Sequence, residues 1–317
     1  MSVFYRSPSV GTRATRGRNA HQPLHQSWSG IMNHLSLWGM KKVVPWFWNN
    51  KLEPMEPFPI NDLPETVVEH ILAFVSPNDL IQNCRLTCKW FRNIVDSNGF
   101  WKAKCEREKR TVPNFRFEEL PPRLYQLICI YDPYGSNLLK NSHGDLKSTS
   151  SARVVGFPHW EIVANGGNGW TVECPPAGAD ALPLENQHCF ATSYDTCRKQ
   201  QVIELAKAGV LPEVLDKLCP SIEVSEWYAA RFDCGSIYEL YVDLLNAEGT
   251  PIASFNTGVI ETQQWVGREW NQVKYTFRHY PAGVRFLKFV HSGRDTQFWA
   301  GHYGSKMAGG AVRIIFE

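Results

Sequence analysis

Two adjacent aromatic residues, Phe298 and Trp299, lie in a segment whose composition is typical of a loop. Glycines bound this segment, residues 293–304, and Asp295 lies between them; both residue types favour turns. An exposed aromatic ring can stack on the C–H face of a sugar ring, while polar neighbours such as Asp295 or Lys288 bond its hydroxyl and acetamido groups. The alternatives are a buried aromatic pair and solvated polar residues, because large aromatic side chains contribute most to stability in a core.

Catalytic patterns are weak throughout the chain. No GxSxG elbow, P-loop, HExxH motif or dinucleotide fingerprint is present. The glycine-rich run 165–169 lacks the strand, lysine and helix of a phosphate cradle, and we predict a hairpin turn there. Cys189 follows His188, but sequence neighbours rarely form a dyad, and the ten histidines show no metal-ligand spacing. We therefore expect a non-catalytic protein without a metal or cofactor.

From about residue 150, the chain has the alternating hydrophobic pattern of short strands. Within residues 236–245, the side chains of Tyr238, Leu240 and Val242 face one way and the residues between them face the other. Further strands, separated by turn residues, are predicted at 201–205, 222–227, 252–255, 273–277, 284–291 and 311–316. Many short strands with little helix favour an antiparallel β-sandwich.

Upstream of these strands, the hydrophobic pattern is helical. Apolar residues at three- and four-residue spacings predict two amphipathic helices, one after Pro64 and one over residues 80–91, with Cys84 and Cys88 in the core face of the second. A proline turn and a capping aspartate at residues 76–79 separate them. Helices this short need a third packing element. The candidates for it are Trp90, Ile94, Phe100 and Trp101.

Length and charge limit the possible functions. A chain of 317 residues is expected to form two domains. Its 33 Lys and Arg against 31 Asp and Glu give a net charge of +2, without the basic excess of a nucleic-acid-binding protein. The nine cysteines form no CxxC pair, so we expect reduced thiols. Since no apolar run approaches the roughly 18 residues of a membrane span or forms a signal peptide, we expect a cytoplasmic protein.

Residues 1–52 differ in composition from the rest of the chain. They contain Lys and Arg but no acidic residue, and they are rich in Ser, Asn, His and Gly, which is typical of a disordered tail. A mitochondrial transit peptide has a similar composition, but the segment 35–48 is interrupted by Gly39 and Pro45. The aromatic run 46–48 is a candidate contact with a partner or a membrane surface.

The order of elements in residues 61–104 resembles the F-box family. Leu-Pro, an apolar helix, Pro, Asp-Leu, the run CRLTCKWF and a final Phe-Trp follow one another. An ordinary three-helix domain would explain the periodicity but not this order. The resemblance implies docking on a Skp adaptor and, through it, a cullin. The residues that match the family's docking positions are Leu63, Pro64, Ile71, Leu72 and Leu80.

Five later segments resemble the F-box-associated (FBA) domain. They are NLLKN at Asn137, NGGNGWTVE at Asn165, FATSYDTCRKQQVIEL at Phe190, WYAARFDCGSIYEL at Trp227 and TFRHYPAGVRFLKFVHSGRDTQFWAGHYG at Thr276. With an F-box upstream, the chain is identified as a member of the sugar-recognising F-box proteins. The fold class is then α+β multidomain: an all-α F-box, a helical connector and an all-β antiparallel, jelly-roll-like sandwich.

The predicted domain boundaries follow from these patterns. Residues 1–54 form a disordered basic tail, and residues 55–104 form the F-box. Residues 105–133 form a rigid helical connector, with a short helix after Pro121 and Pro122, and the FBA region starts within it at about residue 117. Residues 134–317 form the FBA sandwich.

The resemblance implies the substrate-recognition subunit of a Skp, cullin and F-box E3 ubiquitin ligase. Such a subunit would bind the chitobiose core of Asn-linked, high-mannose glycoproteins for ubiquitination and endoplasmic-reticulum-associated degradation. Phe298, Trp299 and Ala300 match the family's binding loop, and Tyr194 matches an aromatic position in a neighbouring loop.

This chain departs from the family at two of these positions. Phe298 lacks the hydroxyl of the tyrosine frequent at its position, and Ala300 replaces the lysine of some members. An F-box adaptor whose FBA domain binds a non-glycan protein substrate is therefore an open alternative. A ligase-independent protein that binds glycans or membranes through its tail is another.

Overall fold

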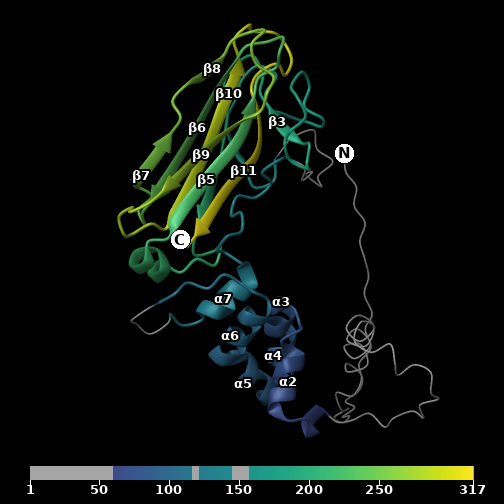
Figure 1. The fold of residues 1–317 in the computed structure, drawn as a ribbon, viewed down its shortest axis with the longest axis vertical. Coiled ribbons are helices and arrows are strands. Elements are labelled where there is room, and N and C mark those ends of the chain that lie inside the picture. Colours follow the sequence, from purple (N-terminus) through teal and green to yellow (C-terminus); the bar gives the residue numbers. More distant parts are fainter. Residues whose placement is uncertain (1–59, 116–120, 145–156, 317) are drawn as a thin grey trace, which may run out of the picture. The chain divides into compact units, whose positions relative to one another are not determined.

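The computed structural model describes residues 60–115, 121–144 and 157–316 (Figure 1). The chain divides into two compact units, Met1–Asp62 and Leu63–Glu317. In the first unit, the described residues form the short 3-10 helix η2 (Ile60–Asp62). The tail predicted at residues 1–54 lies outside the described residues.

The second unit begins with a series of short helices. Their bounds are α2 (Glu65–Leu72), α3 (Pro77–Asp79), the π-helical turn η3 (Leu80–Cys84), α4 (Arg85–Thr87), α5 (Lys89–Asp96) and α6 (Asn98–Arg107). Serine side chains cap the N-termini of α3 and α6. Such caps are needed because the first turn of a helix has backbone N–H groups without partners in the helix. Ser76 Oγ accepts a hydrogen bond from Asp79 N at 3.2 Å, and Ser97 Oγ accepts one from Phe100 N at 3.1 Å.

The second predicted helix is interrupted at Cys88. The backbone of Cys88 is extended, with φ −153° and ψ 166°, and its Sγ accepts a hydrogen bond from Phe91 N at 3.5 Å. The prediction of one continuous helix over residues 80–91 is therefore wrong, and Cys88 is exposed instead of packed in the core. Cysteine is not among the residues that usually cap helices, so the sequence gives no signal for this break.

The helices enclose a small apolar core. Its buried members include Val68, Leu72, Leu80, Phe91, Ile94, Val95, Phe100 and Trp101. Trp101 Nε1 donates to the backbone oxygen of Val95 at 2.7 Å, which satisfies the polar atom of this ring inside the core. Ile94, Phe100 and Trp101 thus supply the predicted third packing element.

Helix α7 (Leu124–Tyr131) follows the prolines 121 and 122, as predicted, and packs on α6. The sulfur atoms of Cys105 on α6 and Cys129 on α7 lie 2.9 Å apart, and Cys105 Sγ also donates to Tyr125 O at 3.2 Å. After Asp132, the chain joins the last strand of the sandwich, where Gly135 N donates to Ile314 O at 2.8 Å.

The rest of the unit is a sandwich of two antiparallel sheets (Figure 1). One sheet has the order β1-β4-β10-β6-β7, with β8 also paired to β6, and the other has the order β2-β3-β11-β5-β9. The strands are β1 (Glu161–Asn165), β2 (Thr171–Glu173), β3 (Cys189–Ala191), β4 (Cys197–Glu204), β5 (Ser221–Ala229), β6 (Ser236–Leu245), β7 (Pro251–Asn256), β8 (Ile260–Thr262), β9 (Asn271–Phe277), β10 (Phe286–Asp295) and β11 (Lys306–Ile315). A π-helical turn, η4 (Val214–Leu218), lies between β4 and β5.

The predicted sandwich is confirmed. The alternation of apolar and polar residues along its strands explains which side chains form its core. In β6, every second side chain is buried, among them Tyr238, Leu240 and Val242, because successive residues of a strand face opposite sides of the sheet. The three-residue strands β2, β3 and β8 and the edge strand β1 were not predicted. They are too short, or too exposed, to produce a pattern of alternation.

The run 165–169 connects the two sheets and does not form a hairpin. Strand β1 before it pairs with β4, whereas β2 after it pairs with β3 in the other sheet. A Cβ atom on Gly169, whose φ is +78°, would lie 2.5 Å from the side chain of Asn165, so the glycine permits a tight crossing. The hairpin prediction failed because local turn chemistry does not show which sheet each flanking strand joins.

Candidate functional site

The strand register brings the predicted sugar-binding residues to one end of the sandwich. Antiparallel pairing places the ends of β1, β3, β5, β8 and β10 beside the starts of β2, β4, β6, β9 and β11. The connections at 166–170, 192–196, 230–235, 263–270 and 296–305 therefore share this end, called the loop end below. In Figure 1, the loop end is at the top of the sandwich, away from the C-terminus.

Hydrogen bonds join three of these connections into one structure. Ser193 Oγ donates to Gly301 O at 2.7 Å and accepts from Asn168 N at 2.8 Å. Gly301 N donates to Asn168 Oδ1 at 2.8 Å, which closes the network. The segment that carries Phe298 and Trp299 is therefore held from both neighbouring loops.

Asp295 fixes the start of the aromatic segment. Its side chain is fully buried, its N–H donates to Ser193 O at 2.9 Å, and its Oδ1 accepts from Phe298 N at 2.5 Å. Phe298 adopts φ +57°, a left-handed conformation that is uncommon for a bulky residue and that the Asp295 bond supports. Both expectations for Asp295, a polar group open to a sugar and a solvated side chain, are wrong, because this fully buried carboxylate anchors the loop from inside.

The structure exposes both rings of the aromatic pair. Phe298 is 67% exposed and Trp299 is 40% exposed, so the alternative in which they belong to the core is wrong. The Trp299 ring has an edge-on contact with Tyr303 at 5.6 Å between centroids. Ala300 is exposed beside them, and Tyr194 is half-buried on the neighbouring loop. The four predicted residues thus share the loop end, where two rings present their surfaces to solvent.

Several residues that support this site were not predicted. Gln297 Oε1 accepts from Gly235 N at 2.7 Å, which ties the aromatic segment to the β5–β6 loop. Ser193 and Asn168 form the hydrogen-bond network described above. The Asn-Gly pattern of the run 165–169 indicated a turn at Asn168. It did not indicate a role in the site, because short polar residues are common in loops of all kinds.

At the other predicted site, apolar side chains lie along α2 and in the turn that follows it. Val67 and Ile71, four residues apart on the helix, are 41% and 37% exposed, and Phe74 in the turn is 68% exposed. Leu63 is half-buried and Pro64 is exposed at the start of the same helix. We call these five residues the α2 face.

Leu72 and Leu80 do not belong to this exposed surface. Leu72 is 4% exposed and Leu80 is 0% exposed, and both lie in the helical core. Helical spacing alone could not separate the outward apolar residues from the inward ones, because α2 carries apolar side chains on both faces. In this structure, Leu72 and Leu80 pack in the helical core, whereas Val67 and Phe74, which were not predicted, are exposed.

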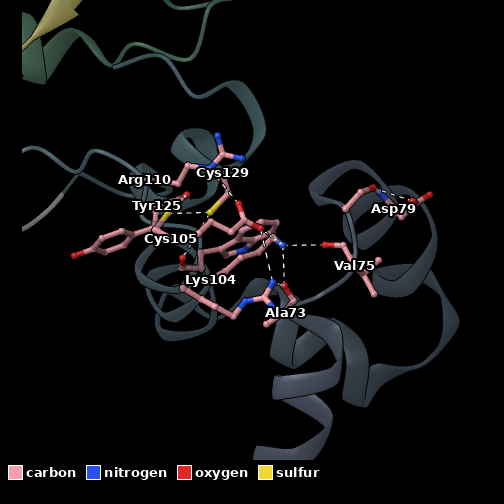
Figure 2. Close-up of polar contacts among 12 residues, drawn as sticks. Ala73, Val75, Asp79, Lys104, Cys105, Arg110, Tyr125 and Cys129 are labelled. Carbon is pink, nitrogen blue, oxygen red and sulfur yellow. Dashed lines mark hydrogen bonds and ion pairs between the residues drawn. The ribbon is translucent and has the colours of Figure 1, made fainter. Parts of the chain in front are cut away.

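Buried and half-buried basic residues of α6 hold the C-terminal end of α2 (Figure 2). Lys104 is 1% exposed, and its Nζ donates to the backbone oxygens of Ala73 and Val75, each at 2.9 Å. Arg107 also donates to Ala73 O, and its guanidinium lies 4.0 Å from the centroid of the Phe74 ring. These donors bond the carbonyl oxygens of the residues that directly follow the last turn of α2.

Two acidic residues complete the support of α2. Glu108 Oε1 lies 2.7 Å from Lys104 Nζ. Burial raises the pKa of Glu108, but hydrogen bonds from Lys104 and Arg110 outweigh it and hold the pKa below its usual value. At the other end of the helix, Glu65 Oε2 accepts from Trp90 Nε1 at 3.0 Å. The α2 face is therefore fixed at both ends by side chains from other helices.

Within the described residues, no group of three or more His, Cys, Asp or Glu side chains is arranged to hold a metal ion. In the same part of the chain, no helix has the length and apolar character needed to cross a membrane. All nine cysteines are free thiols.

Two family models match this chain. An F-box-like model matches residues 60–107, and the model of the F-box associated region matches residues 129–314. The second match begins within α7 and covers nearly all of the sandwich, and the first covers the helices that carry the α2 face.

Curated relatives match over most of their own length. Human F-box only protein 6 is 36% identical over 257 residues, covering 80% of this chain and 84% of that protein. Human F-box only protein 44 is 35% identical, covering 80% and 96%, and mouse F-box only protein 27 is 34% identical, covering 83% and 93%. Among solved structures, the xylan-binding CBM22-1 domain of Paenibacillus barcinonensis Xyn10C aligns at 13% identity and a TM-score of 0.32, covering 58% of this chain and 97% of that domain. The chain belongs to the family of F-box only proteins that carry an F-box associated region.

Proposed function

We propose that this F-box protein is the substrate-recognition subunit of a Skp, cullin and F-box ubiquitin ligase that binds Asn-linked, high-mannose glycoproteins. Its cargo would be misfolded glycoproteins destined for endoplasmic-reticulum-associated degradation, met in the cytoplasm. The protein itself is an adaptor, and ubiquitin transfer is performed by other subunits.

The observation that carries this proposal is the exposed Phe298 and Trp299 pair on a loop held from inside. Exposing two large rings is unfavourable unless a ligand covers them, since burial of such rings is among the largest apolar contributions to stability. The hydrogen bonds of Asp295 and Ser193 hold the backbone of this loop in place before any ligand arrives. Preorganised rings suit a sugar ligand, which offers C–H faces for stacking and hydroxyls for the surrounding polar groups.

The α2 face is the proposed docking surface for the Skp adaptor. It consists of apolar residues along a short helix and at its two ends: Leu63, Pro64, Val67, Ile71 and Phe74. An exposed apolar face of a helix is a common element of protein interfaces. We propose that Leu72 and Leu80 contribute to docking by holding this helix in place from the core.

Replacement of Trp299 by alanine tests the glycan proposal. With the full chain on a glycan array, we expect binding to high-mannose glycans, with competition by free chitobiose, and a loss of at least about tenfold in Trp299→Ala. Tyr131→Ala is the matched control, because Tyr131 is an exposed aromatic residue on α7, outside the loop end. Retained binding in Trp299→Ala would refute the site, and absence of glycan binding in the wild type would favour a non-glycan protein substrate.

A further inference from the structure

A second pair of exposed aromatic residues lies at the loop end. Phe232, on the β5–β6 loop, is 45% exposed, and Trp265, on the β8–β9 loop, is 60% exposed. Their rings meet edge to face, with 5.6 Å between centroids and 71° between planes. Neither residue takes part in the contacts that hold Phe298 and Trp299.

The backbone holds this second pair in place. Trp265 N donates to Phe232 O at 2.9 Å, and Phe232 N donates to Gly178 O at 3.0 Å. Gln264 Nε2 donates to Asp233 O at 2.9 Å, which links the same two loops again. Trp265 adopts φ +68°, so it shares with Phe298 the combination of a left-handed backbone, a large ring and high exposure.

Contacts connect the two aromatic pairs: they lead from Trp299 through Tyr303 to Arg231, the residue before Phe232. Trp299 contacts the Tyr303 ring, and the Arg231 guanidinium lies 4.4 Å from the centroid of that ring. Arg231 precedes Phe232 in the chain, and its guanidinium is held by Asp233 through two hydrogen bonds of 2.8 and 2.9 Å. A ligand that lies over Trp299 and extends across Tyr303 and Arg231 would reach Phe232 and Trp265.

We infer that Phe232 and Trp265 form a further subsite that takes a hexose ring of the same glycan, beyond the sugar unit held at Trp299; this inference rests on the proposed function. The aromatic faces supply the stacking surface, as Phe298 and Trp299 do. Gln263 is exposed two residues before Trp265, and Asp233 follows Phe232 directly in the chain, so polar groups that can bond hydroxyls flank the pair in the sequence. A branched glycan longer than chitobiose would therefore contact two platforms, whereas chitobiose alone would contact one.

The test measures two sugar ligands by calorimetric titration of the full chain. The ligands are free chitobiose and an oligomannose glycan released from its protein. In Trp265→Ala and Phe232→Ala, we expect roughly tenfold weaker binding of the oligomannose glycan, because one platform is lost, and unchanged binding of chitobiose. Trp265→Tyr keeps an aromatic face and should retain most of the affinity, and Tyr131→Ala should bind both sugars normally.

Each other outcome contradicts the inference in a recognisable way. Equal losses of affinity for both sugars would show that the pair only supports the loops. Thermal unfolding of each variant checks that its fold is intact. Unchanged oligomannose binding with normal chitobiose binding overturns this inference alone, whereas a wild type that binds neither sugar overturns the proposed function as well.

Discussion

His291 is fully buried in the sandwich core together with Glu226, Tyr238 and Lys199. Its Nδ1 donates to Glu226 Oε1 at 2.7 Å, and Tyr238 donates to Glu226 Oε2 at 2.8 Å. The imidazole stacks on Trp160 at 4.6 Å between centroids. Nζ of Lys199 lies 3.0 Å from the centroid of the Phe190 ring, and burial lowers the pKa of Lys199 well below the usual value for a lysine.

This cluster predicts that stability falls on acidification. Burial lowers the pKa of His291 to about 4 from 6.5, against the opposing effect of Glu226. Between these values, the unfolded chain binds a proton that the folded chain does not bind, so the free energy of unfolding decreases as the pH falls from about 7 to 4. The expected contribution is about 3 kcal/mol.

Urea unfolding at several pH values measures this effect. His70→Gln, which replaces an exposed histidine on α2, is the control for the loss of one histidine. His291→Gln should remove the part of the slope that lies between pH 6.5 and 4. A wild type whose stability is constant across that range would contradict the prediction.

At the scale of elements, the position of α2 depends on a lysine from another helix. The side chain of Lys104 runs inside the core and donates to two carbonyl oxygens at the end of α2 (Figure 2). A docking helix of eight residues is too short to be stable alone. Its position, and with it the α2 face, is therefore set by contacts from α6.

Lys104→Met is expected to destabilise the helical region. Val75 O would lose its donor inside the protein, whereas Ala73 O would keep Arg107. Loss of this partly buried hydrogen bond costs about 1 kcal/mol. Lys102→Met is the matched control, because Lys102 is an exposed lysine on the same helix. Denaturant unfolding that gives equal midpoints for the two variants would show that the Lys104 bonds contribute little.

At the scale of the whole molecule, the two proposed functions use separate residues. The α2 face lies within residues 63–74, and the loop end is built from connections between strands of the sandwich. No residue belongs to both surfaces. Each surface can therefore be altered without changing the other.

Ile71→Asp is expected to abolish co-purification of the Skp adaptor while glycan binding stays normal. Ile71 is 37% exposed, so the charge is tolerated in the free protein but is unfavourable in an apolar interface. Val202→Asp, at a similarly exposed apolar residue on β4, should affect neither function. Normal recovery of Skp with Ile71→Asp would contradict the docking proposal.

The sequence by itself determined the classes of element and their order. Alternation in β6 and helical spacing in α2 depend on which side of an element meets the core, and this information is local. The same local rules failed at Cys88, where an unusual cap breaks a helix, and at Gly169, where the chain changes sheets. They also missed the shortest strands, which have too few residues to show a period.

Only the tertiary structure decided which side chains are available to a partner. The sequence identified Phe298, Trp299 and Leu80 as candidates without distinguishing exposed residues from buried ones. The structure exposes the two aromatic residues, because the buried carboxylate of Asp295 and the strand register hold their loop outward, and it buries Leu80 among the helices. Exposure depends on contacts between residues far apart in the chain, such as Ser193 with Gly301 and Lys104 with Ala73, and no local pattern encodes them.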